Sequence, residues 1–179
     1  METGKKTKWV IDPAHTEVHF RVKHLVISTV TGSFEKFEGT VLTEGDNFEN
    51  AAAGFSADVD SINTNQPDRE AHLKSPDFFD AANHPKITFK SKSITKKSED
   101  EYIMKGDITI RGTTKELALN VEHGGIVKDH TGATRAGFEI TGKLLRKEFG
   151  LMWDALTETG GVIVSDEVKL LINAELVKQ

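Results

Sequence analysis

Hydrophobic and polar side chains alternate along most of this 179-residue chain. The alternation is clearest near the C-terminus, where Lys169, Asn173 and Glu175 interrupt a row of apolar residues: Val168, Leu170, Ile172, Ala174 and Leu176. Successive side chains of a β-strand point to opposite faces, so a period of two predicts a strand with one dry and one wet face. This period constrains the fold more than any other feature of the chain.

Seven further segments carry the same pattern or a β-branched composition, and turns separate them. The predicted strands cover residues 9–25, 34–43, 53–60, 87–94, 102–111, 117–121, 136–144 and 168–176. Gly124-Gly125 and residues 129–132 are interpreted as a longer loop, and residues 146–159 have an irregular pattern. About eight strands without alternating helices favour an all-β antiparallel sandwich or barrel.

One block, residues 66–84, departs from the strand pattern. Pro67 and Pro76 lie within it and Pro85 follows it directly, and proline disrupts both helix interiors and central strands. Residues 68–74 can form about two helical turns, with acidic residues first and Lys74 near the end. Phe78 and Phe79 follow on a second short turn. They predict either a flap over an apolar space or the closure of one end of a core.

Length and charge restrict the class of protein. A chain of this length can bury a sizeable core as one domain. Its net charge of -5 argues against a general nucleic-acid binder. No apolar run approaches the roughly 20 residues of a membrane-spanning helix. The start, METGKKTKWVID, lacks the apolar stretch of a secretory signal, which predicts a cytoplasmic protein, or a periplasmic one if a signal has been trimmed.

Candidate catalytic and metal-binding residues are scarce. The chain has no cysteine, which excludes disulfides and thiolate chemistry. His15, His19 and His24 lie in one predicted strand but do not form a tight ligand pair with a carboxylate at metal-site spacing, so we predict no metal site. The sequence has neither a Gly-x-Ser-x-Gly element nor a phosphate-binding glycine loop. We therefore expect no catalytic residues and no catalytic cofactor.

The inward faces of the predicted strands bear on whether the interior is hollow. Several of their residues are small: Ala53, Ala57, Gly106, Ala136, Gly142 and Ala174. They are interleaved with larger residues, namely Phe55, Met104, Phe138 and Leu144. Small inward residues leave volume in a barrel, and an eight-stranded barrel can hold one small ligand. The alternative is a flattened sandwich in which small residues allow the sheets to pack closely.

Four stretches of the chain resemble motifs of the YceI-like family, the lipocalin-like polyisoprenoid-binding proteins. The central motif is matched in order by Arg69, His72, Leu73, Ser75, Asp77, Phe78, Phe79, Asp80, Pro85 and Phe89. Residues 11–24, 106–115 and 136–150 are similar to the first, third and fourth motifs. Glu70, His84 and Glu148 depart from the usual residues at their positions. The resemblance covers nearly the whole chain from Trp9 onward.

The resemblance implies a fold and a function. The expected fold is a single eight-stranded antiparallel lipocalin-like β-barrel, residues 9–179, with a short helical insertion near residues 66–84 and a flexible N-terminus at residues 1–8. The expected ligand is a long apolar lipid, such as a polyisoprenoid or an isoprenoid quinone, held in an internal hydrophobic tunnel. Family members are often dimers, so a homodimer is possible. The alternatives are a small enzyme acting on such a lipid and a stress-related interaction domain with a filled core.

The predicted ligand-binding residues form two groups. Arg69 and His72, near Lys74, are candidates to meet a polar head group. Alternatively, Arg69 pairs structurally with a nearby carboxylate. The candidates for the tunnel wall are apolar: Phe20, Phe55, Phe78, Phe79, Phe89, Met104, Ala136, Phe138, Gly142 and Trp153. Among them, Ala136 and Gly142 are predicted to mark positions where volume is missing.

Overall fold

Eleven β-segments and one α-helix make up the structure, a computed structural model that describes residues 6–25, 27–154 and 164–179. The helix is α1 (Pro67–Lys74). The strands are β1 (Lys6–Ile11), β2 (Glu17–His24), β3 (Ser28–Phe34), β4 (Phe37–Glu44), β5 (Asn47–Asp58), β6 (Ile62–Asn63), β7 (Lys86–Lys96), β8 (Glu101–Ile110), β9 (Thr113–Lys128), β10 (Thr134–Leu145) and β11 (Val164–Lys178).

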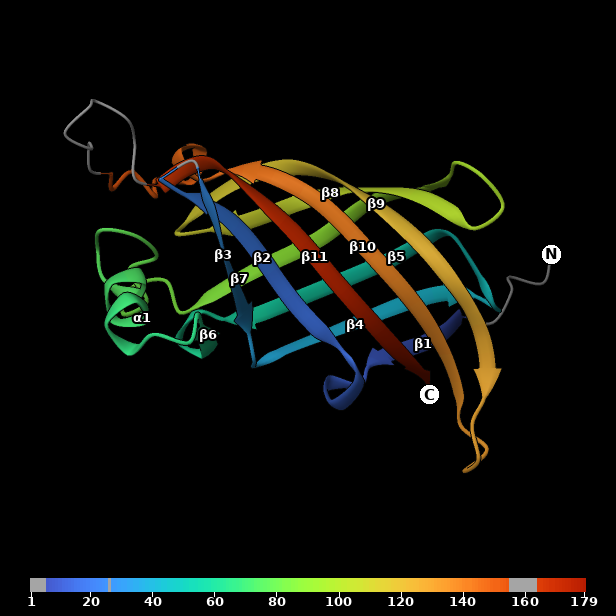
Figure 1. Ribbon diagram of the computed structural model, residues 1–179. Helices are drawn as coiled ribbons and strands as arrows, with labels where there is room; N and C mark the ends of the chain where they lie inside the picture. The colour runs from blue at the N-terminus through green and yellow to red at the C-terminus, as the bar shows by residue number, and fades with distance from the viewer. Residues whose placement is uncertain (1–5, 26, 155–163) are drawn as a thin grey trace.

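Eight of these segments close into an antiparallel barrel (Figure 1), in the order β1-β4-β5-β7-β8-β9-β10-β11. The ring closes where β1 pairs with β11, with Trp9 opposite Lys178 and Ile11 opposite Leu176. The remaining segments extend this ring, since β2 pairs with β11 and β3, and β3 pairs with β6. The predicted all-β, eight-stranded barrel is confirmed.

Three predicted boundaries are wrong. The strand expected over residues 9–25 is broken by a 3-10 turn, Pro13–His15, because the Asp12 side chain accepts a hydrogen bond from the Ala14 amide at 3.0 Å. The loop expected at Gly124-Gly125 is instead part of β9, which accommodates it with a bulge opposite Gly137 and Phe138. In addition, β1 starts at Lys6 and pairs with Glu44, so residues 6–8 do not belong to a flexible terminus.

The helical insertion lies at one end of the barrel, as expected from the prolines, and the β9–β10 connection lies at the other (Figure 1). Pro67 occupies the start of α1, where a missing amide hydrogen is tolerated. The Glu70 carboxylate anchors the helix to the preceding loop, because it accepts hydrogen bonds from the amides of Thr64 (2.8 Å) and Gln66 (3.1 Å). The first of these bonds is the main cause that lowers the pKa of Glu70.

The end of the barrel opposite α1 is filled by aromatic side chains. The Trp9 indole is fully buried, lies 5.2 Å from the Phe48 ring and donates a hydrogen bond to the Thr43 hydroxyl at 3.0 Å. Phe48 in turn contacts Phe138 at 4.8 Å between ring centroids, and the His123 ring stacks on Phe138 at 4.7 Å. We refer to this filled part of the barrel as the closed end.

Candidate functional site

A cavity of about 690 Å³ occupies the interior of the barrel between the closed end and α1. Strands β1–β5 and β7–β11 all contribute to its wall, and so do eight of the residues from Thr64 to Phe79. The wall is predominantly apolar, with side chains such as Phe89, Leu119, Ile140 and Leu170. Ligand sites in proteins have volumes of roughly 300–1,000 Å³ and similar linings, so this cavity has the size and character of a small-molecule site.

Ten of the twelve predicted site residues lie in the wall of this cavity. They are Phe20, Phe55, Phe78, Phe79, Phe89, Met104, Phe138, Trp153, Arg69 and His72. Strand alternation explains the apolar members, because inward positions of a barrel strand face one enclosed space. Phe78 and Phe79 line the end of the cavity beside α1, which agrees with the first of the two arrangements considered from the sequence, a flap over an apolar space.

The two predicted residues that lie outside the cavity wall are Ala136 and Gly142. Ala136 is fully buried in the packed core, where β10 pairs with β11 through Leu176. A Cβ atom built on Gly142 would lie 2.4 Å from Leu119 Cδ2, so the leucine side chain already fills the space that the glycine leaves. The inference that these two small residues mark missing volume is therefore wrong, because Leu119 fills the space over Gly142 and Ala136 is buried away from the cavity.

Polar side chains in the wall gather at the α1 end, which we call the mouth. Apart from Thr40 and Tyr102, they come from the end of β2, from residues 64–72 and from Arg146. Arg69 donates from Nε to Thr64 Oγ1 (3.0 Å) and from Nη2 to the Thr64 carbonyl (2.6 Å). Within the described ranges it forms no ion pair with a carboxylate, so the expected structural partner is a threonine instead.

His72 and Trp153 connect α1 to the segment that follows β10. The two rings meet edge to face at 4.7 Å, and the Phe78 ring lies 5.1 Å from His72. His72 Nε2 also lies 2.9 Å from Asp77 Oδ2, which orients the imidazole. One side of the mouth is therefore an aromatic cluster built from two segments that are far apart in the sequence.

Two arginines that the sequence interpretation did not single out as site residues organise the mouth. Arg146 is buried and donates to four backbone carbonyls, those of Leu151, Trp153, Val164 and Ser165, at 2.7–3.2 Å. Arg111 Nη1 donates to the carbonyls of Phe78 and Gly150, both at 2.9 Å. Arg146 continues the inward row of Ile140, Gly142 and Leu144 at a spacing of two. A charged residue in that row is the sequence signal that could have identified it.

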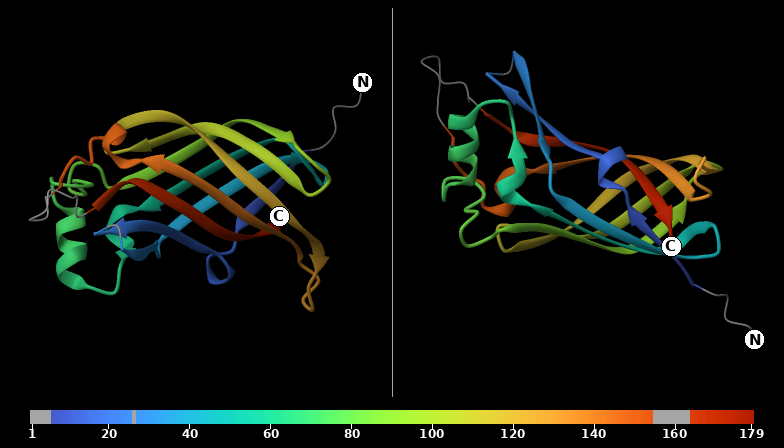
Figure 2. Two further views of the ribbon diagram at one scale, coloured as in Figure 1. Left: turned by 45° about the horizontal axis from the view of Figure 1, so that its top comes forward. Right: turned by 90° about the horizontal axis from the view of Figure 1, so that it is seen from below.

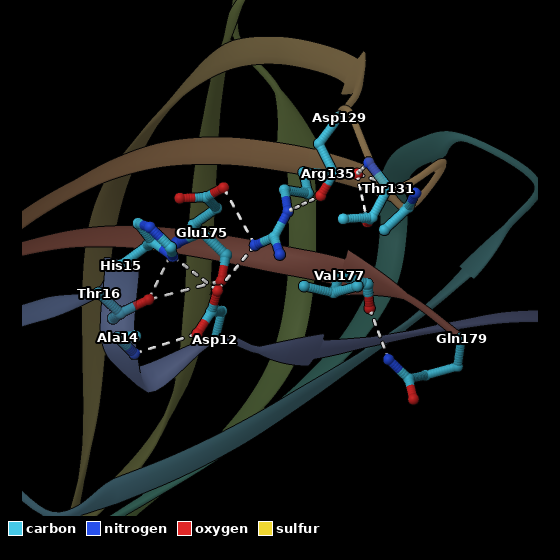
Figure 3. Close-up of polar contacts among 11 residues, drawn as sticks. Asp12, Ala14, His15, Thr16, Asp129, Thr131, Arg135, Glu175, Val177 and Gln179 are labelled. Atoms are coloured by element: carbon cyan, nitrogen blue, oxygen red, sulfur yellow. Dashed lines mark hydrogen bonds and ion pairs between the residues drawn. The ribbon is translucent and has the colours of Figure 1, made fainter.

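A second polar cluster lies near the opposite end, outside the cavity (Figure 3). Arg135 binds three carboxylates, with 2.7 Å to Asp129, 2.7 Å to Asp12 and 3.2 Å to Glu175. Hydrogen bonds from His15 and then Arg135 lower the pKa of Asp12 to about 2, while the carboxylate of Asp12 raises the pKa of His15. Thr131 and then Arg135 lower the pKa of Asp129. Each carboxylate has a cationic partner, so this cluster joins β1, β11 and the β9–β10 connection.

The described residues contain no group of three or more His, Asp or Glu side chains arranged to hold a metal ion. In the same residues, no helix is both long and apolar enough to cross a membrane.

Residues 9–176 match the YceI-like domain. UPF0312 protein SAB2563 of Staphylococcus aureus is 37% identical over 170 residues, which span 94% of this chain and 96% of that protein.

Solved structures with the same fold were also found. A YCEI protein of Campylobacter jejuni, 32% identical, superposes with a TM-score of 0.74 over 94% of this chain and 96% of that one. BcnA of Burkholderia cenocepacia gives a TM-score of 0.80 at 22% identity over 92% and 98% of the two chains. A polyisoprenoid-binding domain of Saccharophagus degradans gives 0.70 at 14% identity over 96% and 98%. The chain belongs to the YceI-like family.

Proposed function

We propose that this protein binds a long apolar lipid, such as a polyisoprenoid or an isoprenoid quinone, with the chain in the barrel cavity and the head group at the mouth. The observation that carries the proposal is the cavity of about 690 Å³, apolar along its wall and polar mainly at one end. The polyisoprenoid-binding domain of Saccharophagus degradans, which has the same fold, supports a ligand of this class.

The chemistry of the mouth favours a head group with acceptor oxygens. Lys23 and Arg69 contribute only hydrogen-bond donors, and both line the cavity. Phosphate oxygens and quinone carbonyls accept such bonds. Arg146 donates to backbone carbonyls, so we assign it the role of holding the mouth together and not of binding the head group.

The polar wall residues favour binding over catalysis. Asp68 is the only carboxylate among the described residues of the cavity wall, and it is exposed on α1. Acid–base chemistry on a lipid inside the barrel would require a titratable pair near the reacting atoms, whereas Asp68 and His72, which is paired with Asp77, lie at the mouth on α1. An interaction domain with a filled core is disfavoured by the cavity itself.

Two measurements test the proposal. Organic extraction of the purified protein followed by mass spectrometry should release an endogenous lipid. After extraction, a fluorescent prenyl probe should bind with one site per barrel, and a farnesyl or longer alcohol should displace it. If no lipid is extracted and the probe does not bind to folded protein, the proposal is wrong.

A further inference from the structure

The hairpin that joins β2 to β3 ends in exposed apolar side chains. Ile27 is 85% exposed and Leu25 is 39% exposed. We call these two residues the hairpin tip. Figure 2 shows the hairpin projecting away from the barrel at the end where α1 lies. A third exposed apolar residue, Met152, lies at this same end, between two residues whose carbonyls are held by Arg146.

The backbone of the hairpin tip is strained at Leu25, a position where a glycine or asparagine would adopt the same conformation at lower cost. Leu25 has a φ angle of 53°, in the left-handed region, and the amide of Ile27 donates the turn hydrogen bond to the His24 carbonyl at 3.3 Å. Tight hairpin turns place glycine, asparagine or aspartate at such positions, because a bulky side chain is disfavoured there. A leucine that is both strained and exposed indicates a role outside the fold.

The hairpin also carries positive charge and no negative charge, although the whole protein is acidic. From Val18 to Phe34 the sequence contains no aspartate or glutamate, whereas Arg21 and Lys23 add two positive charges. The whole chain carries a net charge of -5. Basic residues beside exposed apolar side chains are the combination that binds an anionic bilayer surface, where apolar groups enter the interface and cations meet lipid phosphates.

The hairpin is continuous with the mouth of the cavity. Lys23, His24 and Val30 belong to the cavity wall, although Leu25 and Ile27 do not. The start of β11 joins the two regions, because Val164 pairs with His24 and the Lys23 amide donates to Ser165 Oγ at 3.2 Å. A membrane that contacts the hairpin tip therefore lies next to the opening through which a lipid would enter.

We propose that the hairpin tip docks the mouth of the barrel onto the surface of an anionic phospholipid bilayer. Leu25 and Ile27 enter the interfacial region, and Arg21 and Lys23 approach the lipid phosphates. The inference rests on the proposed function only in assuming that a lipid passes between the bilayer and the cavity. Binding to vesicles and binding of a probe in the cavity are separate measurements, so the failure of one is distinguishable from the failure of the other.

The test is flotation of the lipid-free protein with phosphatidylcholine vesicles that contain about 30% phosphatidylglycerol, and with vesicles of phosphatidylcholine alone. We expect binding to the anionic vesicles that weakens as salt is raised. The double variant Leu25→Asn, Ile27→Ser should reduce the partition coefficient at least about tenfold, because two apolar side chains that would enter the bilayer interface are lost. Arg21→Gln should reduce it roughly fivefold on anionic vesicles only.

Val127→Ser is the matched control. Val127 is 64% exposed but lies on β9 near the opposite end of the barrel, so this variant should bind vesicles like the natural sequence. The double variant should keep its probe affinity in solution and its melting temperature, because asparagine tolerates the left-handed region better than leucine. These two readouts separate a docking role from a structural one.

Three results would overturn the proposal. The first is absence of the natural protein from the floating fraction of anionic vesicles. The second is equal loss of binding in Val127→Ser and in the double variant. The third is a change of oligomeric state in the double variant, measured by light scattering, without any vesicle binding by the natural protein, since the hairpin tip would then be a contact between copies of the chain.

Discussion

The two ends of the barrel are built on different principles. At the closed end, large side chains pack directly on one another, with Trp9, Phe48 and Phe138 in contact inside and the Arg135 cluster outside. At the mouth, arginine side chains hold backbone segments in place by hydrogen bonds, and α1 contributes no fully buried residue.

Because of this difference, one end of the barrel mainly stabilises the fold, and the other end controls access of a ligand to the cavity. Burial of aromatic side chains contributes most of the stabilisation that a barrel end can offer, and it leaves no route to the interior. Hydrogen bonds between a side chain and a few carbonyls stabilise less, and they can break without unfolding the barrel. We therefore expect substitutions at the closed end to change stability first, and substitutions at the mouth to change ligand exchange first.

Trp9→Ala tests the closed end and has the largest expected effect. The change removes a fully buried indole and its hydrogen bond to Thr43, so the free energy of unfolding should fall by about 3–5 kcal/mol. Urea denaturation followed by circular dichroism measures the loss. Trp153→Ala, at the mouth, is the matched variant and should lose less stability but more probe affinity. Equal destabilisation by the two changes would contradict the contrast between the ends.

Ala136→Leu and Ala174→Leu compare two inward positions that receive the same added volume. Ala136 lies in packed core, so its replacement should overpack the barrel and cost about 1–3 kcal/mol of unfolding free energy. Ala174 lines the cavity, so leucine there should leave the melting temperature nearly unchanged and weaken binding of the prenyl probe. Thermal unfolding and probe titration on lipid-free protein check both. If Ala174→Leu destabilised the protein and Ala136→Leu weakened probe binding instead, the empty volume would lie beside Ala136 and not beside Ala174.

Arg111→Asn tests the hydrogen bonds by which Arg111 joins Phe78 to Gly150 at the mouth. Arg111 has a φ of 49°, which asparagine tolerates well, but only the arginine reaches the carbonyls of Phe78 and Gly150. We expect a loss of about 1–2 kcal/mol in unfolding free energy, since two hydrogen bonds disappear while strain is relieved. The rate of probe dissociation, measured by stopped-flow competition, should rise. An unchanged rate would indicate that the helical insertion does not gate the cavity.

Asp12→Asn tests the polar cluster at the closed end and has the smallest expected effect. The pKa of Asp12 is lowered from 3.8 to about 2, so its stabilising contribution is present above about pH 4 and disappears as the pH falls toward 2. The difference in unfolding free energy between the natural protein and the variant should therefore shrink over this interval. Measurements stay below pH 5, where His15, whose pKa is raised, remains protonated.

The control for this comparison is Asp46→Asn, which removes an exposed partner of Lys178. Exposed ion pairs contribute little, so this variant should show only a small difference in unfolding free energy from the natural protein. A constant difference for Asp12→Asn between pH 4 and 2 would show that its carboxylate does not stabilise the fold through His15 and Arg135.

The sequence by itself determined the strand content, the antiparallel pairing of neighbouring strands and the position of the helical insertion. Alternation with a period of two assigns each residue to a face, and inward residues of a closed barrel must share one interior. This is why Phe20, Phe89 and Phe138, from strands far apart in the chain, could be predicted to line the same space. The prolines in and next to residues 66–84 likewise predicted where the strand pattern is interrupted, because proline disrupts a central strand whatever its tertiary surroundings.

Only the tertiary structure decided which inward positions are empty and which long-range partners the charged residues choose. Alternation predicts which face of the strand Gly142 occupies. It does not predict that the side chain of Leu119, from the neighbouring strand, fills the space over this glycine. It likewise cannot show that Arg135 meets Asp12, which lies 123 positions away. Such contacts depend on barrel closure and strand register, which bring together side chains whose separation in the chain carries no information about their distance in space.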